Sequence, residues 1–241
     1  MYKQLLNSES DCNINNDKYI INNYNNLLGE RPVLDVGRVH NDILAWVFNI
    51  IKTKQAFKCV SEYRSFLIET ISDYLISNYS ELHNKKEISN FIYSVDELIS
   101  SEANIIGNSI LNKRSDFYYS TVNDIINSTY ASNPEVFEKY VKDLINNVSY
   151  KLNYIELKSI NAVSSIAIHS SYYWKENLNS WIAEYKKYNG GYTQSNLPAY
   201  MYADARAARD LGSMWVWGSS VLNAGYCAYC SARFIRTFGI G

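Results

Sequence analysis

The sequence has few cysteines, no long apolar run and almost no net charge, and each absence excludes a class of protein. Four cysteines scattered over 241 residues are too few for a disulfide framework, so reduced thiols are expected. No window reaches the roughly 20 uninterrupted apolar residues that a membrane-spanning helix needs. The formal net charge of −1 gives no electrostatic basis for binding nucleic acid. No basic run is present that would hold the chain to an anionic bilayer.

The motifs of common catalytic and metal sites are also missing. The chain contains no GxSxG, Walker glycine loop, GxGxxG, HExxH or ExxH pattern. His40, His83 and His169 each lack another histidine or a cysteine three or four residues away, which is the spacing that a zinc site on a helix needs. We therefore predict no catalytic residue, no metal and no cofactor, and a non-enzyme is favoured.

The N-terminal stretch differs from a secretory signal, because it has neither an uninterrupted apolar core nor a small-residue cleavage site. A cytoplasmic protein is therefore expected. Residues 1–30 are rich in asparagine and weakly periodic, which predicts a loose arm. Residues 31–241 are expected to form one helical domain, and a sub-boundary could fall at 189–198, which contains the turn-forming Gly190 and Gly191.

Apolar side chains recur at three- and four-residue steps through most of the chain, which is the spacing of amphipathic helices. Asp35 and Ser115 are suited to cap helix starts, and Pro134 behind Asn133 favours the first turn of another helix. No run of β-branched residues with alternating polarity competes for a strand. The sequence therefore predicts an all-α, single-domain bundle of about seven or eight helices.

Two stretches lack a polar face and are expected to be buried. The first is 154–174, and a separate amphipathic helix is expected to follow it over 174–189. The second is 199–238, which contains no lysine and combines alanine, glycine and serine with aromatic residues. Small residues one helical turn apart allow close packing of helices. A buried C-terminal helical hairpin is therefore predicted.

Asp204 is the carboxylate that fits its surroundings least, because four alanines flank it in the second apolar stretch. If this helix is buried, an unpaired charge there would cost several kcal/mol, so a polar partner is required. His40, Asn41 and His169 are the polar groups on apolar faces, and a direct hydrogen bond from His40 or Asn41 is expected. We favour a structural polar tether over a catalytic Asp/His pair.

Cys227 and Cys230 are the closest pair of potential metal ligands in the chain. A single CxxC without a second pair is a weak signal, and on a helix it places two small side chains on one face. Packing is therefore favoured over metal binding or redox chemistry.

Three short motifs carry a resemblance to a family. GRVHNDIL contains His40 and Asn41, SSYYW contains Ser170 and Trp174, and YADARAARDLG contains Asp204. Together they resemble an uncharacterised bacterial family of helical proteins with an N-terminal HN motif and a C-terminal Ala-Asp, Gly/Ala-rich segment. Two arginines in the third motif depart from the small, neutral pattern of that segment. The resemblance implies a fold and no activity.

A second likeness is to the double-glycine precursors of small bacteriocins. Gly190 and Gly191 would be the processing site, and residues 192–241 would be a membrane-active segment rich in small residues. Export by a double-glycine route would follow, although true leaders are far shorter than 191 residues. The favoured function is a non-catalytic structural or interaction protein that binds a protein partner or itself. The bacteriocin-like precursor is the first alternative, and an enzyme that uses a buried Asp/His site is the second.

Overall fold

The computed structural model describes residues 35–54, 57, 59–101, 114–189, 204, 205, 207, 208 and 220–238. Over this part of the chain the structure is all-α and contains no strand, as predicted. The elements are α3 (Val36–Ile51), α4 (Val60–Asn78), α5 (Lys85–Ser101), α6 (Asp116–Ile126), η2 (Thr129–Ser132), α7 (Pro134–Val148), η3 (Ser149–Lys151), α8 (Tyr154–Asn189) and α10 (Ser220–Phe238). Residues 204, 205, 207 and 208 are also helical. The predictions for the arm at 1–30 and for Gly190 and Gly191 lie outside the described residues.

Three helix starts lie where the sequence places capping residues. The Asp35 carboxylate accepts a hydrogen bond from the backbone of α3, and the Ser115 hydroxyl does the same at α6. Pro134 is the first residue of α7, behind an Asn133 cap. Side-chain oxygens at these positions satisfy backbone N–H groups that have no partner within the helix. The all-α prediction is therefore confirmed, and so are the predicted starts of α3, α6 and α7.

α8 differs from the prediction of two separate helices that meet at Trp174. It is one helix of 36 residues from Tyr154 to Asn189. No glycine or proline occurs between its two ends, so nothing in the local sequence stops it. The polar face is missing over 154–174 and returns over 174–189. This change reflects different packing neighbours along one continuous helix rather than a break between two helices.

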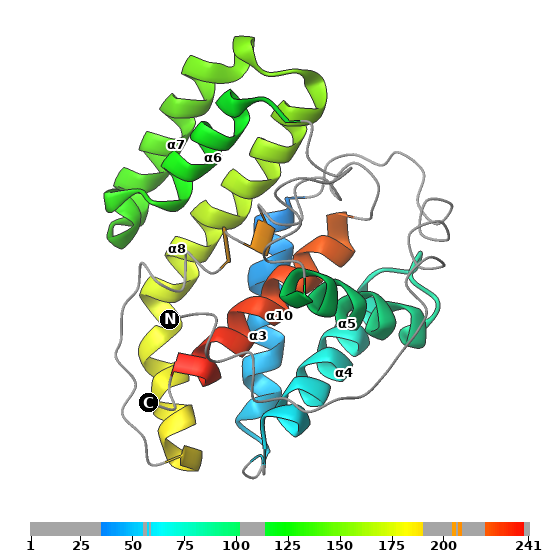
Figure 1. Cartoon of the computed structure of the whole chain (residues 1–241). Coiled ribbons are helices and arrows are strands. Elements are labelled where there is room, and N and C mark those ends of the chain that lie inside the picture. Colours follow the sequence, from blue (N-terminus) through cyan, green and yellow to red (C-terminus); the bar gives the residue numbers. More distant parts are fainter. Residues whose placement is uncertain are drawn as a thin grey trace.

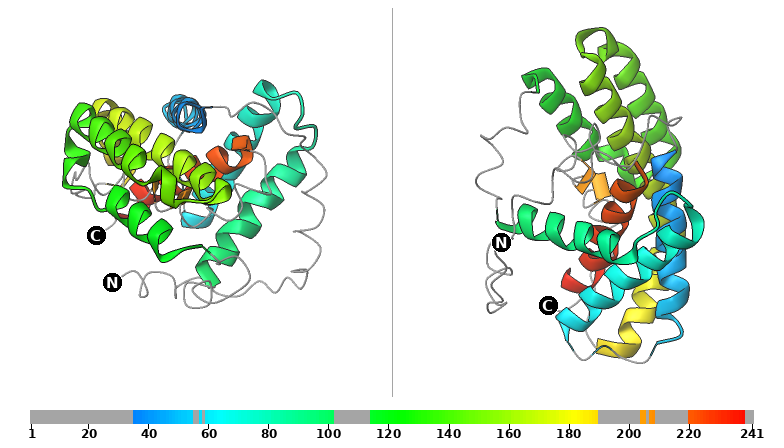
Figure 2. Two further views of the ribbon diagram at one scale, coloured as in Figure 1. Left: turned by 90° about the horizontal axis from the view of Figure 1, so that it is seen from above. Right: turned by 90° about the vertical axis from the view of Figure 1, so that its right-hand side faces the viewer.

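The bundle is arranged around α8 and α10. α6 and α7 pack on the N-terminal half of α8, and α3 packs farther along it (Figure 1). α10 crosses α3 and also contacts α4, α5 and α8. Figure 2 shows α10 in the interior of the lower part of the molecule, with α3, α4 and α5 around it. α10 is thus the inner helix that the other helices cover.

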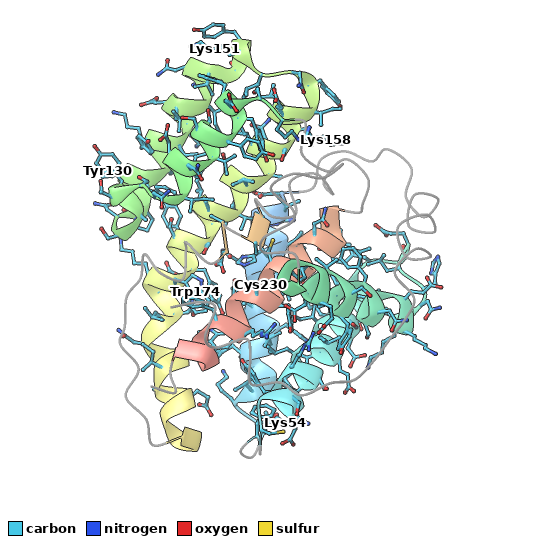
Figure 3. The ribbon with its side chains drawn as sticks, viewed as in Figure 1. Lys54, Tyr130, Lys151, Lys158, Trp174 and Cys230 are labelled. Carbon is cyan, nitrogen blue, oxygen red and sulfur yellow. The ribbon has the colours of Figure 1, made fainter. Side chains whose placement is uncertain are left out.

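The residues of α10 from 221 to 229 are all buried, and Ala232 is 0% exposed. Figure 3 labels Cys230 on α10 in the middle of the molecule and Lys151 at the end formed by α6, α7 and the start of α8, where Lys151 is exposed. Ala205, Ala207 and Ala208 are buried as well, so both described parts of the C-terminal region belong to the core. Among the described residues, no helix is both long enough and apolar enough to cross a membrane.

Close contact between α3 and α8 depends on Gly37. Its backbone N–H donates to the Ser165 hydroxyl at 3.0 Å. A Cβ added at Gly37 would collide with the Ser165 carbonyl group, coming within 2.6 Å of its carbon, and would also lie 2.6 Å from Cδ2 of His169. The two helices therefore approach as closely as their backbones allow.

Gly37→Ala should lower the free energy of unfolding by about 2 to 3 kcal/mol, because a backbone carbonyl cannot move aside as a side chain can. Gly225→Ala is the matched control, since the nearest atom to its added Cβ is the flexible end of Leu75, at 2.9 Å. We expect Gly225→Ala to change stability by less than about 1 kcal/mol, because gained helix propensity offsets the contact. Urea unfolding of both variants checks this, and equal losses would contradict it.

Candidate functional site

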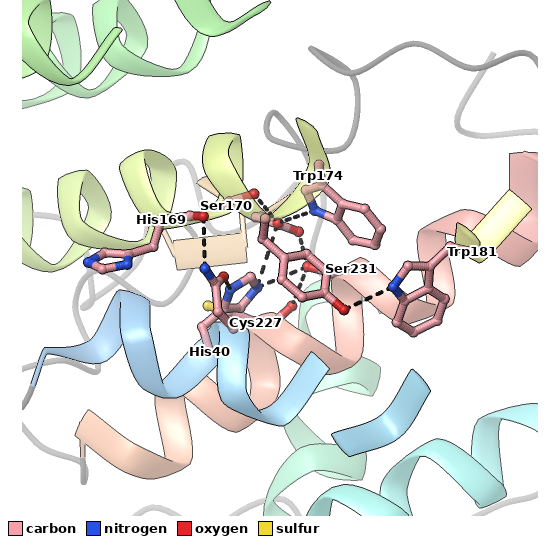
Figure 4. Close-up of polar contacts among 10 residues, drawn as sticks. His40, His169, Ser170, Trp174, Trp181, Cys227 and Ser231 are labelled. Carbon is pink, nitrogen blue, oxygen red and sulfur yellow. Dashed lines mark hydrogen bonds and ion pairs between the residues drawn. The ribbon is translucent and has the colours of Figure 1, made fainter. Parts of the chain in front are cut away.

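Asp204 contacts side chains of α3, α8 and α10 and forms a buried polar cluster with them. Figure 4 shows His40, Ser170, Trp174 and Ser231 of this cluster converging from the three helices. The Asp204 Oδ2 accepts hydrogen bonds from the Ser170 hydroxyl and from the Trp174 indole N–H, the latter at 2.9 Å. Its Oδ1 is hydrogen-bonded to the Ser231 hydroxyl. All four side chains are 0% exposed. Both oxygens of the buried carboxyl group therefore have hydrogen-bond partners, which is what burial of such a group requires.

His40 reaches Asp204 through Ser231. Its Nε2 lies 3.1 Å from the Ser231 Oγ and 3.6 Å from the Asp204 Oδ2. The second distance is too long for a hydrogen bond. The connection between α3 and Asp204 is thus indirect, whereas a direct hydrogen bond from His40 or Asn41 was expected. The Ser231 hydroxyl is hydrogen-bonded to both groups and bridges them, so Ser231 on α10 takes the place expected for a direct contact.

Asn41 and His169 extend the cluster towards the surface. Asn41 Nδ2 donates to the His169 carbonyl oxygen at 2.8 Å, and its Oδ1 lies 3.0 Å from the His40 Nδ1. The His169 ring points away from Ser170, Trp174 and Ser231 (Figure 4), and its Nε2 lies 3.0 Å from the Asp35 carboxylate. Of the four residues proposed from the sequence, His40, Asn41 and Asp204 meet through their side chains. His169 contributes only its backbone to this contact.

Burial dominates the acid-base behaviour of the pair. It raises the pKa of Asp204 to about 8, although the hydrogen bonds from Ser170 and Trp174 act in the opposite direction. Burial lowers the pKa of His40 to about 4, and the hydrogen bond with Asn41 opposes this shift. Both directions favour the uncharged form of each group at neutral pH.

Ser231 was missed by the sequence reasoning, and Ser170 and Trp174 entered it only as part of a motif. Serines occur throughout helices, and their role here depends on contacts across 34 and 27 residues of sequence. One signal was available. Ser231 lies one turn after Cys227, whose carbonyl oxygen is 3.0 Å from its hydroxyl, on the small-residue face of the buried helix. A polar residue on such a face needs a partner.

A second polar cluster was also missed. The Asp96 carboxylate of α5 accepts hydrogen bonds from Arg233 Nη1 at 2.7 and 2.5 Å and from the Tyr229 hydroxyl at 2.9 Å. Arg64 of α4 lies 2.9 Å from the same carboxylate and also contacts Glu97 at 2.7 Å. These residues occupy ordinary amphipathic positions, so no local pattern reveals that they pair. The cluster joins α4 and α5 to α10.

Cys227 and Cys230 lie on α10 as free thiols. Burial raises the pKa of the Cys230 thiol well above its usual range, which keeps it protonated and unreactive. No group of three or more histidine, cysteine or acidic side chains that could hold a metal ion occurs within the described ranges.

Comparisons of the chain with protein-family models, with curated proteins and with solved structures gave no match.

Proposed function

We propose that the protein is a non-catalytic structural or interaction protein whose core is closed by the Asp204 cluster. The observation that carries this is the complete burial of Asp204 together with its hydrogen-bond partners on α8 and α10. A carboxylate in this state already uses both oxygens and has no access to a substrate. Its contribution is to hold helices from both ends of the chain together.

The three motifs that carry the resemblance to the HN and Ala-Asp family meet in this cluster. The HN motif contributes His40 and Asn41, and the Ala-Asp motif contributes Asp204 to one cluster. The SSYYW motif supplies Ser170 and Trp174. We propose that these three motifs form one structural unit in this chain. A protein partner or a second copy of the chain remains the proposed binding target.

One arrangement favours the enzyme alternative. Ser231, His40 and Asn41 follow the order of nucleophile, base and orienting group, with contacts of 3.1 and 3.0 Å. Against it, Ser231 and His40 are both 0% exposed, and the Ser231 hydroxyl is already hydrogen-bonded to Asp204. The three side chains have the geometry of a catalytic triad, but a substrate cannot reach the Ser231 hydroxyl as an active triad requires.

Ser231 should therefore not react with a fluorophosphonate probe that labels active-site serines. The folded wild-type protein and Ser231→Ala should give the same background signal in mass spectrometry. Stoichiometric labelling of Ser231 in the folded protein, slowed by His40→Ala, would instead establish the enzyme alternative. Near-ultraviolet circular dichroism on each sample shows whether the variants are folded.

The packing of α10 counts against the precursor alternative. Its face towards α3, α4 and α5 includes the fully buried Tyr226, Cys227 and Tyr229. Release of 192–241 as a peptide would expose the surfaces that these side chains cover. We therefore propose that this segment is the inner layer of the bundle rather than a detachable effector.

A further inference from the structure

The hydrogen-bond partners of His40 fix the position of one proton. Asn41 Nδ2 donates to the His169 carbonyl oxygen at 2.8 Å, so its amide oxygen faces the imidazole ring. An amide oxygen can only accept a hydrogen bond. His40 Nδ1 must therefore carry a hydrogen, and in the neutral ring Nε2 is then an acceptor.

Ser231 cannot satisfy all its neighbours with its own hydrogen. Its hydroxyl has a single hydrogen, and it faces the Asp204 Oδ1, the His40 Nε2 at 3.1 Å and the Cys227 carbonyl oxygen at 3.0 Å. A carboxylate, a neutral Nε2 and a carbonyl oxygen are all acceptors. The Cys227 carbonyl oxygen already accepts a backbone N–H within α10, as in any α-helix, and does not need the hydroxyl hydrogen. The carboxylate and Nε2 cannot both be satisfied by one hydrogen, so one more proton is required, either on Asp204, which then donates to Ser231, or on His40 Nε2.

We propose that the core holds one bound proton along the chain Asp204–Ser231–His40, that Asp204 carries it at neutral pH, and that its loss is a pH-sensitive switch that loosens the fold. In this state the Asp204 O–H donates to the Ser231 Oγ, and the Ser231 O–H donates to His40 Nε2. If the Asp204 proton moves to Ser231 and the Ser231 proton moves to His40 Nε2, the result is a charged Asp204 and a charged His40. No carbon, nitrogen or oxygen atom moves, so the neutral and the charged form are consistent with the same contacts.

The surroundings select the uncharged form. The titratable groups nearest the pair are His169 and Tyr173 from α8 and Cys227 and Cys230 from α10 (Figure 4 labels Cys227 beside His40). From the start of α3, Asp35 contacts His169 rather than the pair itself. Burial raises the pKa values of Tyr173 and Cys230, so both stay neutral. His169 is engaged with Asp35 at 3.0 Å. No cation among the described residues compensates a charged Asp204, and burial accordingly raises the pKa of Asp204 to about 8.

The sign of the pH dependence follows from where the protons are bound. The pKa of Asp204 is near 3.8 when unfolded and about 8 when folded, so its contribution to stability is complete at low pH and is lost as pH rises through 8. The pKa of His40 falls from 6.5 to about 4, so its contribution is present above 6.5 and is lost as pH falls through 4. Between about pH 4 and 6.5 the two effects oppose each other. Between about 6.5 and 8 only the Asp204 effect acts.

The substitution Asp204→Asn distinguishes the proposed neutral form from the alternative in which Asp204 is charged and His40 carries the proton. The asparagine amide reproduces protonated aspartic acid, because its N–H can donate to Ser231 while its oxygen accepts from Ser170 and Trp174. We expect the unfolding equilibrium constant of the wild type to rise by up to tenfold per pH unit, relative to Asp204→Asn, between pH 6.5 and 8. The matched control Asp143→Asn changes an exposed carboxylate on α7 and should keep the wild-type dependence.

Urea unfolding midpoints from pH 5.5 to 9 measure this difference. Infrared spectra of the folded protein at pH 6.5 give a second readout, since the carbonyl band of a protonated carboxylic acid should be present in the wild type and absent in Asp204→Asn. Equal pH dependence in the wild type and Asp204→Asn would overturn the proposal. So would strong destabilisation of Asp204→Asn at pH 6.5 without the infrared band in the wild type, which would place the proton on His40.

Discussion

Deleting residues 192–241 should abolish the cooperative unfolding of the remaining chain. The deletion removes α10, which contacts α3, α4, α5 and α8, and it removes Asp204 with the buried alanines beside it. The remaining helices would then expose the apolar faces that now cover α10. A fragment in this condition keeps helical secondary structure but loses fixed side-chain packing.

Near-ultraviolet circular dichroism and urea unfolding of the 1–191 fragment test this expectation. The far-ultraviolet spectrum should remain helical, whereas the near-ultraviolet signal and the sigmoidal unfolding curve should be lost. Adding the 192–241 peptide in excess should restore part of both signals. A fragment that unfolds cooperatively on its own, together with a peptide that releases dye from liposomes, would favour the bacteriocin-like precursor.

Asp204→Ala should lower the free energy of unfolding by about 2 to 4 kcal/mol. The substitution leaves the Ser170 hydroxyl, the Trp174 indole N–H and Ser231 without their shared partner, and each buried group without a partner costs about 1 to 3 kcal/mol before relaxation. Water entering the space would reduce the total, so the three costs do not add fully.

Asp143→Ala is the control, because Asp143 is exposed on α7. Its effect should stay within about 0.5 kcal/mol, as for most surface substitutions. Denaturant midpoints compare the two variants at pH 6.5, which is below the pKa of about 8 that burial gives Asp204. Small, equal shifts for both would show that the carboxylate of Asp204 is hydrated.

Helix starts could be predicted because their signals are local. Asn133 and Pro134 specify the beginning of α7 within two residues, and Asp35 does the same for α3. The length of α8 was not predicted, because a change of neighbours along a helix produces the same loss of polar face as a change of helix. Local periodicity cannot distinguish these two cases.

The candidate site could be predicted in part, for a physical reason that does not depend on spacing. A carboxylate among alanines needs a partner wherever the fold places it, and this identified Asp204 with His40 and Asn41. The partners that complete the cluster are serines and a tryptophan, which fit helices without any polar role. Asp96 and Arg233 are 137 residues apart, and nothing in either helix indicates that they meet.

The central claim is that Asp204 and His40 act as one unit through Ser231, and a double-mutant cycle tests it most directly. We expect Asp204→Ala with His40→Ala to cost at least about 1 kcal/mol less than the sum of the single changes, since either change alone breaks the connection. The cycle of Asp204→Ala with Asp143→Ala should be additive within about 0.5 kcal/mol. Additivity in the first cycle as well would show that the two residues contribute independently and would contradict the account.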